Sequence, residues 1–157
     1  MPVHVILTLR VPEIALTGQL VRAFQSYFAG DIIVMHSRLT LAERNDAVIR
    51  VRRGEAGIII GARSALFTPA DDVGLIILDE EQDMSYKQDE SPRYHARVVA
   101  EELAHLHHAV LLLGSATPSL ETYHRARTGE LTLLTMRHRV GDIPLPEVSC
   151  VDMRQEL

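Results

Sequence analysis

The chain has 157 residues with 16 basic and 21 acidic side chains, one cysteine and one lysine, and at this length a single domain with a buried core is expected. The net charge of −5 argues against a generic basic nucleic-acid coat, although a local cationic strip can still bind phosphates. One cysteine excludes an internal disulfide, no apolar run spans a bilayer and no secretory signal is visible, so we expect a cytoplasmic protein without membrane contact.

Apolar runs alternate with helical stretches along the chain. Strands are expected at about residues 3–9, 32–35, 57–60, 75–78 and 110–113, and helices at about 16–28, 41–53, 94–107 and 119–127. Thr40 and Glu43 fit a capping box that opens the second helix. Because the apolar runs are continuous rather than alternating, they indicate a parallel sheet covered on both faces. A short strand is also expected at 148–151, where the chain leaves the domain.

Polar residues follow the predicted strands directly, and ligands bind outside the carboxyl ends of the strands in open α/β sheets. The carboxylates Asp79, Glu80 and Glu81 give the strongest local signal. Adjacent carboxylates repel one another unless a cation neutralises them, and Mg²⁺ prefers such oxygen ligands. Asp79 would then hold the metal and Glu80 would polarise water. The alternative is an acidic cap on the next segment.

Two further strand ends carry ambiguous signals. In 114–118, the hydroxyls of Ser115 and Thr117 can bond carboxylates or phosphate, but an ordinary turn with Ser119 as helix cap also fits. In 61–64, Arg63 either binds a phosphate or lies on a solvated rim. Neither segment decides between its two interpretations alone.

Aromatic and cationic side chains are interleaved between Asp83 and Arg97. They are Tyr86, Lys87, Arg93, Tyr94, His95 and Arg97. This pattern suits single-stranded nucleic acid, because rings stack on bases while cations meet phosphates. The alternative is a flexible surface loop with incidental charge.

Six segments, at 11–17, 61–67, 79–82, 85–88, 93–97 and 114–119, resemble in order and spacing the PriA family of superfamily 2 DNA helicases, which act in bacterial replication restart. The resemblance covers about residues 3–154. It implies a RecA-like α/β fold, with a parallel sheet and helices on both faces, and ATP and Mg²⁺ as cofactors. The implied partners are single-stranded and forked DNA, primosome proteins and single-stranded-DNA-binding protein.

The resemblance also assigns roles to particular positions. Helicase motifs Ia and Ib correspond to 12–17 and 61–64, and motif III corresponds to Gly114, Ser115, Ala116 and Thr117, which couple nucleotide state to DNA contact. The catalytic box is Asp79, Glu80, Glu81 and Gln82, with Asp79 for Mg²⁺ and Glu80 for the hydrolytic water. The implied DNA-binding residues are Pro12, Glu13, Thr17, Gly61, Arg63, Ser64, Tyr86, Lys87, Arg93, Tyr94, His95 and Arg97.

Three positions depart from the family pattern. Gln82 stands where the family usually has histidine, Gly18 where it has proline, and Arg38 where it has glycine. Glutamine can still donate and accept hydrogen bonds, so coupling at Gln82 is expected to be altered rather than lost.

The only lysine, Lys87, follows Tyr86, so the sequence contains no Gly-x-x-x-x-Gly-Lys-Ser/Thr phosphate loop. In the family this loop precedes motif Ia, and zinc-binding cysteines and a second lobe follow. We therefore expect residues 1–136 to be a partial ATP-binding lobe that lacks the phosphate-loop strand, and 137–157 to be an exit segment. The chain would be a helicase fragment without ATP turnover of its own, or a truncated non-catalytic module that binds DNA or restart proteins. The incomplete sheet should expose an edge and an apolar face, giving low stability or self-association.

Overall fold

The computed structural model describes residues 4–8, 18–28 and 32–137. Its backbone contacts divide the chain into two compact units, 1–120 and 121–157. The first unit contains the sheet and all the motifs that the structure describes. The predicted boundary near residue 136 stays a prediction, and the strand expected at 148–151 lies outside the described residues.

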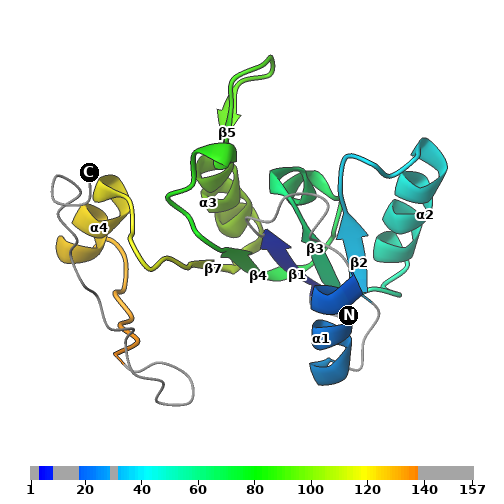
Figure 1. The fold of residues 1–157 in the computed structure, drawn as a ribbon, viewed down its shortest axis with the longest axis horizontal. Helices are drawn as coiled ribbons and strands as arrows, with labels where there is room; N and C mark the ends of the chain where they lie inside the picture. The colour runs from blue at the N-terminus through cyan, green and yellow to red at the C-terminus, as the bar shows by residue number, and fades with distance from the viewer. Residues whose placement is uncertain (1–3, 9–17, 29–31, 138–157) are drawn as a thin grey trace, which may run out of the picture. The chain divides into compact units, whose positions relative to one another are not determined.

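The first unit is built on a parallel sheet, as predicted (Figure 1). Its strands are β1 (His4–Thr8), β2 (Ile32–Met35), β3 (Ile58–Gly61), β4 (Val73–Leu78) and β7 (Val110–Leu113). They lie in the order β2-β3-β1-β4-β7, and each neighbouring pair is parallel. A separate antiparallel hairpin is formed by β5 (Lys87–Gln88) and β6 (Tyr94–His95).

The helices follow the predicted segments closely. They are α1 (Gly18–Tyr27), α2 (Leu41–Arg52), α3 (Ala96–His107) and α4 (Leu120–Arg127), with short 3₁₀ turns η1 (Arg63–Phe67) and η2 (Met84–Tyr86). The capping box is confirmed, since the Thr40 backbone amide donates to Glu43 Oε2 at 2.8 Å and the Glu43 amide donates to Thr40 Oγ1 at 3.3 Å. The helix expected from Tyr94 begins at Ala96, because Tyr94 and His95 form β6.

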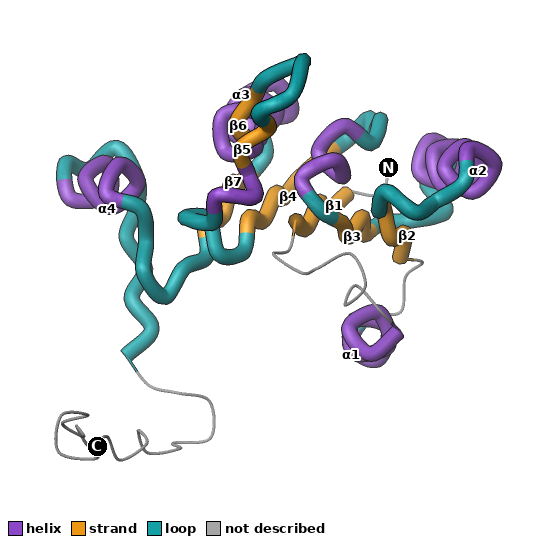
Figure 2. The backbone as a smooth tube through the Cα atoms, turned by 45° about the horizontal axis from the view of Figure 1, so that its top comes forward, coloured by secondary structure: helices purple, strands orange, loops and turns teal. Residues whose placement is uncertain are grey.

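Helices lie on both faces of the sheet, which confirms the predicted layering (Figure 2). On one face, α2, α3 and η1 cover a core that includes Ile59, Ile76 and Leu78. On the other face, Phe24 of α1 packs against a smaller cluster around Leu7, Ile32, Ile58 and Ile60. In β1, β2 and β3, alternate residues therefore face different cores, as the period of two requires.

The strand β7 forms one edge of the sheet and keeps apolar surface in water. Val110 and Leu112 are 63% and 42% exposed. Both follow the period of two, so they lie on the face opposite Leu111 and Leu113, which pack against the larger core. An apolar parallel edge strand is an open template for pairing with another chain.

We expect the 157-residue chain to self-associate through this edge, so that its average mass in sedimentation velocity rises with protein concentration. Leu112→Lys should reduce the association, because a charge on the edge opposes strand pairing. Leu106→Lys is the matched control, since Leu106 is also exposed but lies on α3. A monomer with a sharp thermal transition that does not depend on concentration would contradict the expectation.

Candidate functional site

The carboxyl ends of β4 and β7 bring the two strongest polar motifs together. Leu78 and Leu113 are paired in register, and the Gly114 amide donates to the Leu78 carbonyl at 2.8 Å. The Glu81 amide then donates to the Gly114 carbonyl at 3.0 Å. A Cβ on residue 114 would lie 3.5 Å from Asp79 Oδ1, an ordinary van der Waals distance, so the backbone of motif III lies beside this carboxylate.

Gln82 connects the two motifs through both ends of its side-chain amide. Its Nε2 donates to Glu80 Oε2 at 2.6 Å, and its Oε1 accepts from Ser115 Oγ at 2.6 Å. Ser115 Oγ in turn accepts from the Thr117 amide at 3.0 Å. A glutamine can therefore make both contacts of a bridging side chain, and its amide does not titrate.

The backbone of Glu80 adopts a left-handed conformation with φ of 51°. A residue with a Cβ is strained by roughly 1–2 kcal/mol in this region, which normally favours glycine. Such strain persists where surrounding contacts hold it, and it concentrates at functional sites. The turn it makes separates Glu80, whose carboxylate bonds Gln82, from Glu81, which points into the protein.

Glu81 is fully buried and makes a structural network. Its side chain is 0% exposed and accepts from Arg97 Nη1 at 3.2 Å, from the Ser119 amide at 2.7 Å and from Ser119 Oγ at 3.1 Å. Arg97 Nη1 also donates to Ser119 Oγ at 3.0 Å. Glu81 was predicted to act in catalysis and Arg97 to bind DNA. In the structure the two side chains instead bind each other inside the protein.

Tyr86 also differs from its predicted role as a stacking ring. It is only 2% exposed, and its hydroxyl donates to the Asp79 carbonyl at 2.6 Å and lies 3.2 Å from the Thr8 carbonyl. Burial raises the pKa of the Tyr86 phenol, which keeps the hydroxyl protonated as a donor. The ring cannot meet a base without leaving the core, but its hydroxyl fixes the backbone of the residue expected to hold Mg²⁺.

Arg63 is partly exposed and makes contacts that its sequence context did not predict. Its guanidinium donates to the backbone carbonyls of Ser85 at 2.6 Å and Lys87 at 2.7 Å, and to the side-chain oxygen of Gln88. Arg63 therefore fastens the start of the hairpin to η1. Of the other motif Ib positions, Gly61 is buried and Ser64 is exposed. The predicted motif Ia residues Pro12, Glu13 and Thr17 lie outside the described residues.

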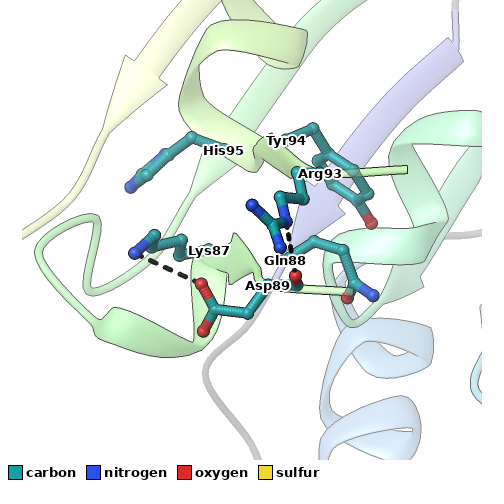
Figure 3. Close-up of a pocket in the computed structure, with 6 residues that line it drawn as sticks. All are labelled: Lys87, Gln88, Asp89, Arg93, Tyr94 and His95. Atoms are coloured by element: carbon teal, nitrogen blue, oxygen red, sulfur yellow. Dashed lines mark hydrogen bonds and ion pairs between the residues drawn. The ribbon is translucent and has the colours of Figure 1, made fainter. Parts of the chain in front are cut away.

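The hairpin carries most of the remaining predicted DNA-binding residues around an open pocket (Figure 3). Lys87 faces His95 and Gln88 faces Tyr94 across the two strands. Lys87 Nζ pairs with Asp89 at 3.2 Å, and Arg93 Nε donates to the Asp89 carbonyl at 3.0 Å.

The ring of His95 caps α3 from the end of the hairpin. Burial lowers the pKa of the His95 imidazole, and the nearby Arg97 and Lys87 cations lower it further. The neutral ring accepts from the Arg97 amide at Nδ1, which caps the start of α3. His95 is thus placed to hold the helix, with its base contact still a prediction.

One exposed residue next to the hairpin was missed as a site residue. Phe67, at the end of η1, is 57% exposed and meets the Tyr94 ring edge to face, with centroids 5.1 Å apart. The sequence signal was present, because Phe67 ends the segment 61–67 that matches the helicase family. Its exposure could not be known without the fold.

The donor set can be compared with the needs of the expected cofactors. Among the described residues, no group of three or more His, Cys, Asp or Glu side chains could hold a metal ion. Mg²⁺ fits, because it needs only one or two carboxylates when phosphate oxygens and water complete its shell, and Asp79 supplies one. No helix in the described residues has the length and apolar character needed to span a membrane.

Residues 4–126 match the model of the DEAD/DEAH box helicase family. This chain belongs to that family. Its relatives include Replication restart protein PriA from Bacillus subtilis (strain 168), with 50% identity over 147 residues, 94% of this chain and 18% of the relative. The PriA protein of Synechocystis sp. is 47% identical over 152 residues, which cover 94% of this chain and 18% of the relative. The PriA protein of Chlamydia pneumoniae is 44% identical over 149 residues, which cover 94% of this chain and 20% of the relative.

These similarities confirm the resemblance that the six motifs indicated, and with the parallel sheet they confirm the RecA-like α/β fold. The chain spans about a fifth of the length of the relatives it matches.

Proposed function

We propose that this chain supplies the catalytic box (79–82) and motif III of a 3'-to-5' DNA helicase that couples Mg-ATP hydrolysis to movement along single-stranded DNA in replication restart. The observation that carries the proposal is the Gln82 bridge, with Glu80 at 2.6 Å on one side and Ser115 at 2.6 Å on the other. This amide joins the two motifs through their side chains, beside the backbone bond from the Glu81 amide to the Gly114 carbonyl, and would transmit a change in nucleotide state to motif III. The expected compartment is the cytoplasm.

The residues of the chain divide the work between them. Asp79 would hold Mg²⁺, which when bound to ATP neutralises charge on the phosphates. Glu80 would orient the attacking water, because its second carboxylate oxygen stays available while Oε2 accepts from Gln82. Tyr86 fixes the Asp79 carbonyl, and Arg63 fixes the hairpin that would meet single-stranded DNA. Forked DNA, primosome proteins and single-stranded-DNA-binding protein are the proposed partners of the larger protein.

A second candidate is a non-catalytic module that binds DNA or replication-restart proteins. This sequence contains no Gly-x-x-x-x-Gly-Lys-Ser/Thr loop, and the two candidates differ in whether the whole protein has one. The gene sequence before the codon for Met1 separates the two candidates. An open frame that encodes such a loop supports the helicase, whereas a stop codon supports the module.

The chain alone should show no ATP turnover with Mg²⁺ and single-stranded DNA, although it should bind the DNA. If the open frame encodes the loop, the protein from that frame should hydrolyse ATP in a DNA-stimulated manner. Glu80→Gln should abolish turnover, and Gln82→Ala should remove most of the stimulation by DNA. Gln25→Ala, at an exposed position on α1, is the matched control. Turnover by the 157-residue chain that Glu80→Gln abolishes, or full stimulation in Gln82→Ala, would overturn the proposal.

A further inference from the structure

Phe67 and Tyr94 form an exposed aromatic pair where η1 meets the hairpin. Their ring planes cross at 82°, and Phe67 keeps 57% of its surface in water. The exposed part of the Phe67 ring is apolar aromatic surface, which can stack on another flat π system. This exposed surface is the part of the pair that a flat ligand would use.

The position of the pair is set by contacts that do not involve the two rings. Arg63 lies four residues before Phe67 and bonds the carbonyls of Ser85 and Lys87. It also bonds the side chain of Gln88, which pairs with Tyr94 in the hairpin. The guanidinium thus fixes η1 against β5, and β5 fixes Tyr94 next to Phe67. Rings held in this way lose little conformational entropy when a ligand stacks on them.

The charges around the pair favour a ligand that is recognised by stacking more than by its net charge. Lys87 is paired with Asp89, and Arg93 lies between Asp89 and Tyr94 in sequence and donates to the Asp89 carbonyl. Glu90 adds a second carboxylate to the hairpin. The two cations can still touch phosphates, but the balanced charge gives only weak long-range attraction. Affinity for a nucleic acid would then depend strongly on the bases.

We infer that Phe67 and Tyr94 form a stacking platform for an unpaired nucleobase of single-stranded DNA. The inference rests on the proposed function, because that function brings single-stranded DNA to the hairpin. It adds Phe67 to the binding surface and gives Tyr94 a defined contact. Lys87 and Arg93 meet the flanking phosphates.

The test compares two fluorescein-labelled oligonucleotides of equal length, one of deoxythymidine and one abasic, by anisotropy with the 157-residue chain. Both present the same phosphates, so their affinity ratio isolates the bases. The chain should bind the thymidine strand at least about fivefold more tightly, since stacking on one aromatic ring is worth roughly 1–3 kcal/mol. Phe67→Leu and Tyr94→Leu should each bring the ratio close to one, and Phe67→Tyr should preserve it.

Phe28→Leu is the matched control, because Phe28 is an exposed member of another aromatic pair, with Phe24 on α1, and should leave the ratio unchanged. The chain has no tryptophan, so Phe67→Trp adds a single reporter. The indole fluorescence of this variant should be quenched by the thymidine strand and not by the abasic strand.

The outcomes separate the inference from the proposed function. Three results would overturn the stacking platform alone. They are an unchanged affinity ratio in Phe67→Leu, equal binding of both strands by the unmodified chain, and indole fluorescence of Phe67→Trp that stays unquenched when the thymidine strand is bound. If the chain binds neither strand, DNA binding by the hairpin is overturned, and the stacking platform with it. The labelled thymidine strand can also be competed with an unlabelled protein or with unlabelled thymidine strand. If only the protein removes the preference for the thymidine strand, the rings bind a protein partner, and the inference is overturned.

Discussion

Replacing Arg97 with alanine should lower the free energy of unfolding by about 3 kcal/mol, because it takes the compensating cation from a buried carboxylate. The side chain of Glu81 is 0% exposed, and Arg97 Nη1 lies 3.2 Å from its Oε2. The bonds from Ser119 to Glu81 would persist, but a serine brings no positive charge. Urea denaturation of the 157-residue chain, followed by circular dichroism, measures the loss.

The matched control is Arg53→Ala. Arg53 pairs with Glu55 at 3.8 Å, and both side chains are well exposed, so the change should be about 0.5 kcal/mol or less. Glu81→Gln combined with Arg97→Ala should cost less than the sum of the two single changes, because each removes the same interaction. Equal losses for Arg97→Ala and Arg53→Ala would show that the buried pair contributes nothing to stability.

This pair also explains how the site is organised. Glu81 belongs to the catalytic box, Arg97 to the first turn of α3, and Ser119 to the segment after motif III. One buried network therefore fixes three segments around the carboxyl ends of β4 and β7. We expect Glu81 and Arg97 to position the site, while Asp79 and Glu80 face the chemistry.

The positions of the strands and helices could be predicted because they depend on local signals. Continuous apolar runs such as 58–60 mark buried parallel strands, and the Thr40 and Glu43 spacing marks a helix start. The order of the motifs likewise identified the helicase family. These signals lie within a few residues of the features that they predict.

The directions of individual side chains could not be predicted, because they depend on contacts between distant segments. Tyr86 turns inward toward the carbonyls of Thr8 and Asp79, the first of them 78 residues away. Arg63 turns toward the hairpin 22 to 25 residues later. Both residues were predicted to bind DNA because their side-chain chemistry suits that role. Only the packing of η1, η2 and β1 shows where the two side chains point.

Gly61→Ala should destabilise the chain by about 2–3 kcal/mol, since a Cβ at this position would overpack a rigid environment. The added carbon would lie 2.3 Å from the Met35 carbonyl oxygen and 2.8 Å from the Ala65 Cβ. One of these atoms is backbone in β2 and the other is a buried methyl of η1, so neither can rotate away. The end of β3 must therefore separate from β2 or from η1.

Gly57→Ala provides the matched control, because no atom lies within 4 Å of a Cβ built there. Its effect should be within about 1 kcal/mol and can be stabilising, since alanine restricts the unfolded chain more than glycine does. Denaturant midpoints of the two variants measure the difference. Because Gly61 precedes Arg63 by two residues, the shift should also loosen the hairpin and weaken the preference for bases over abasic DNA. Equal midpoints for the two alanine variants would mean that η1 can move without cost, and the fixed geometry of Arg63 and Phe67 would then lose its physical basis.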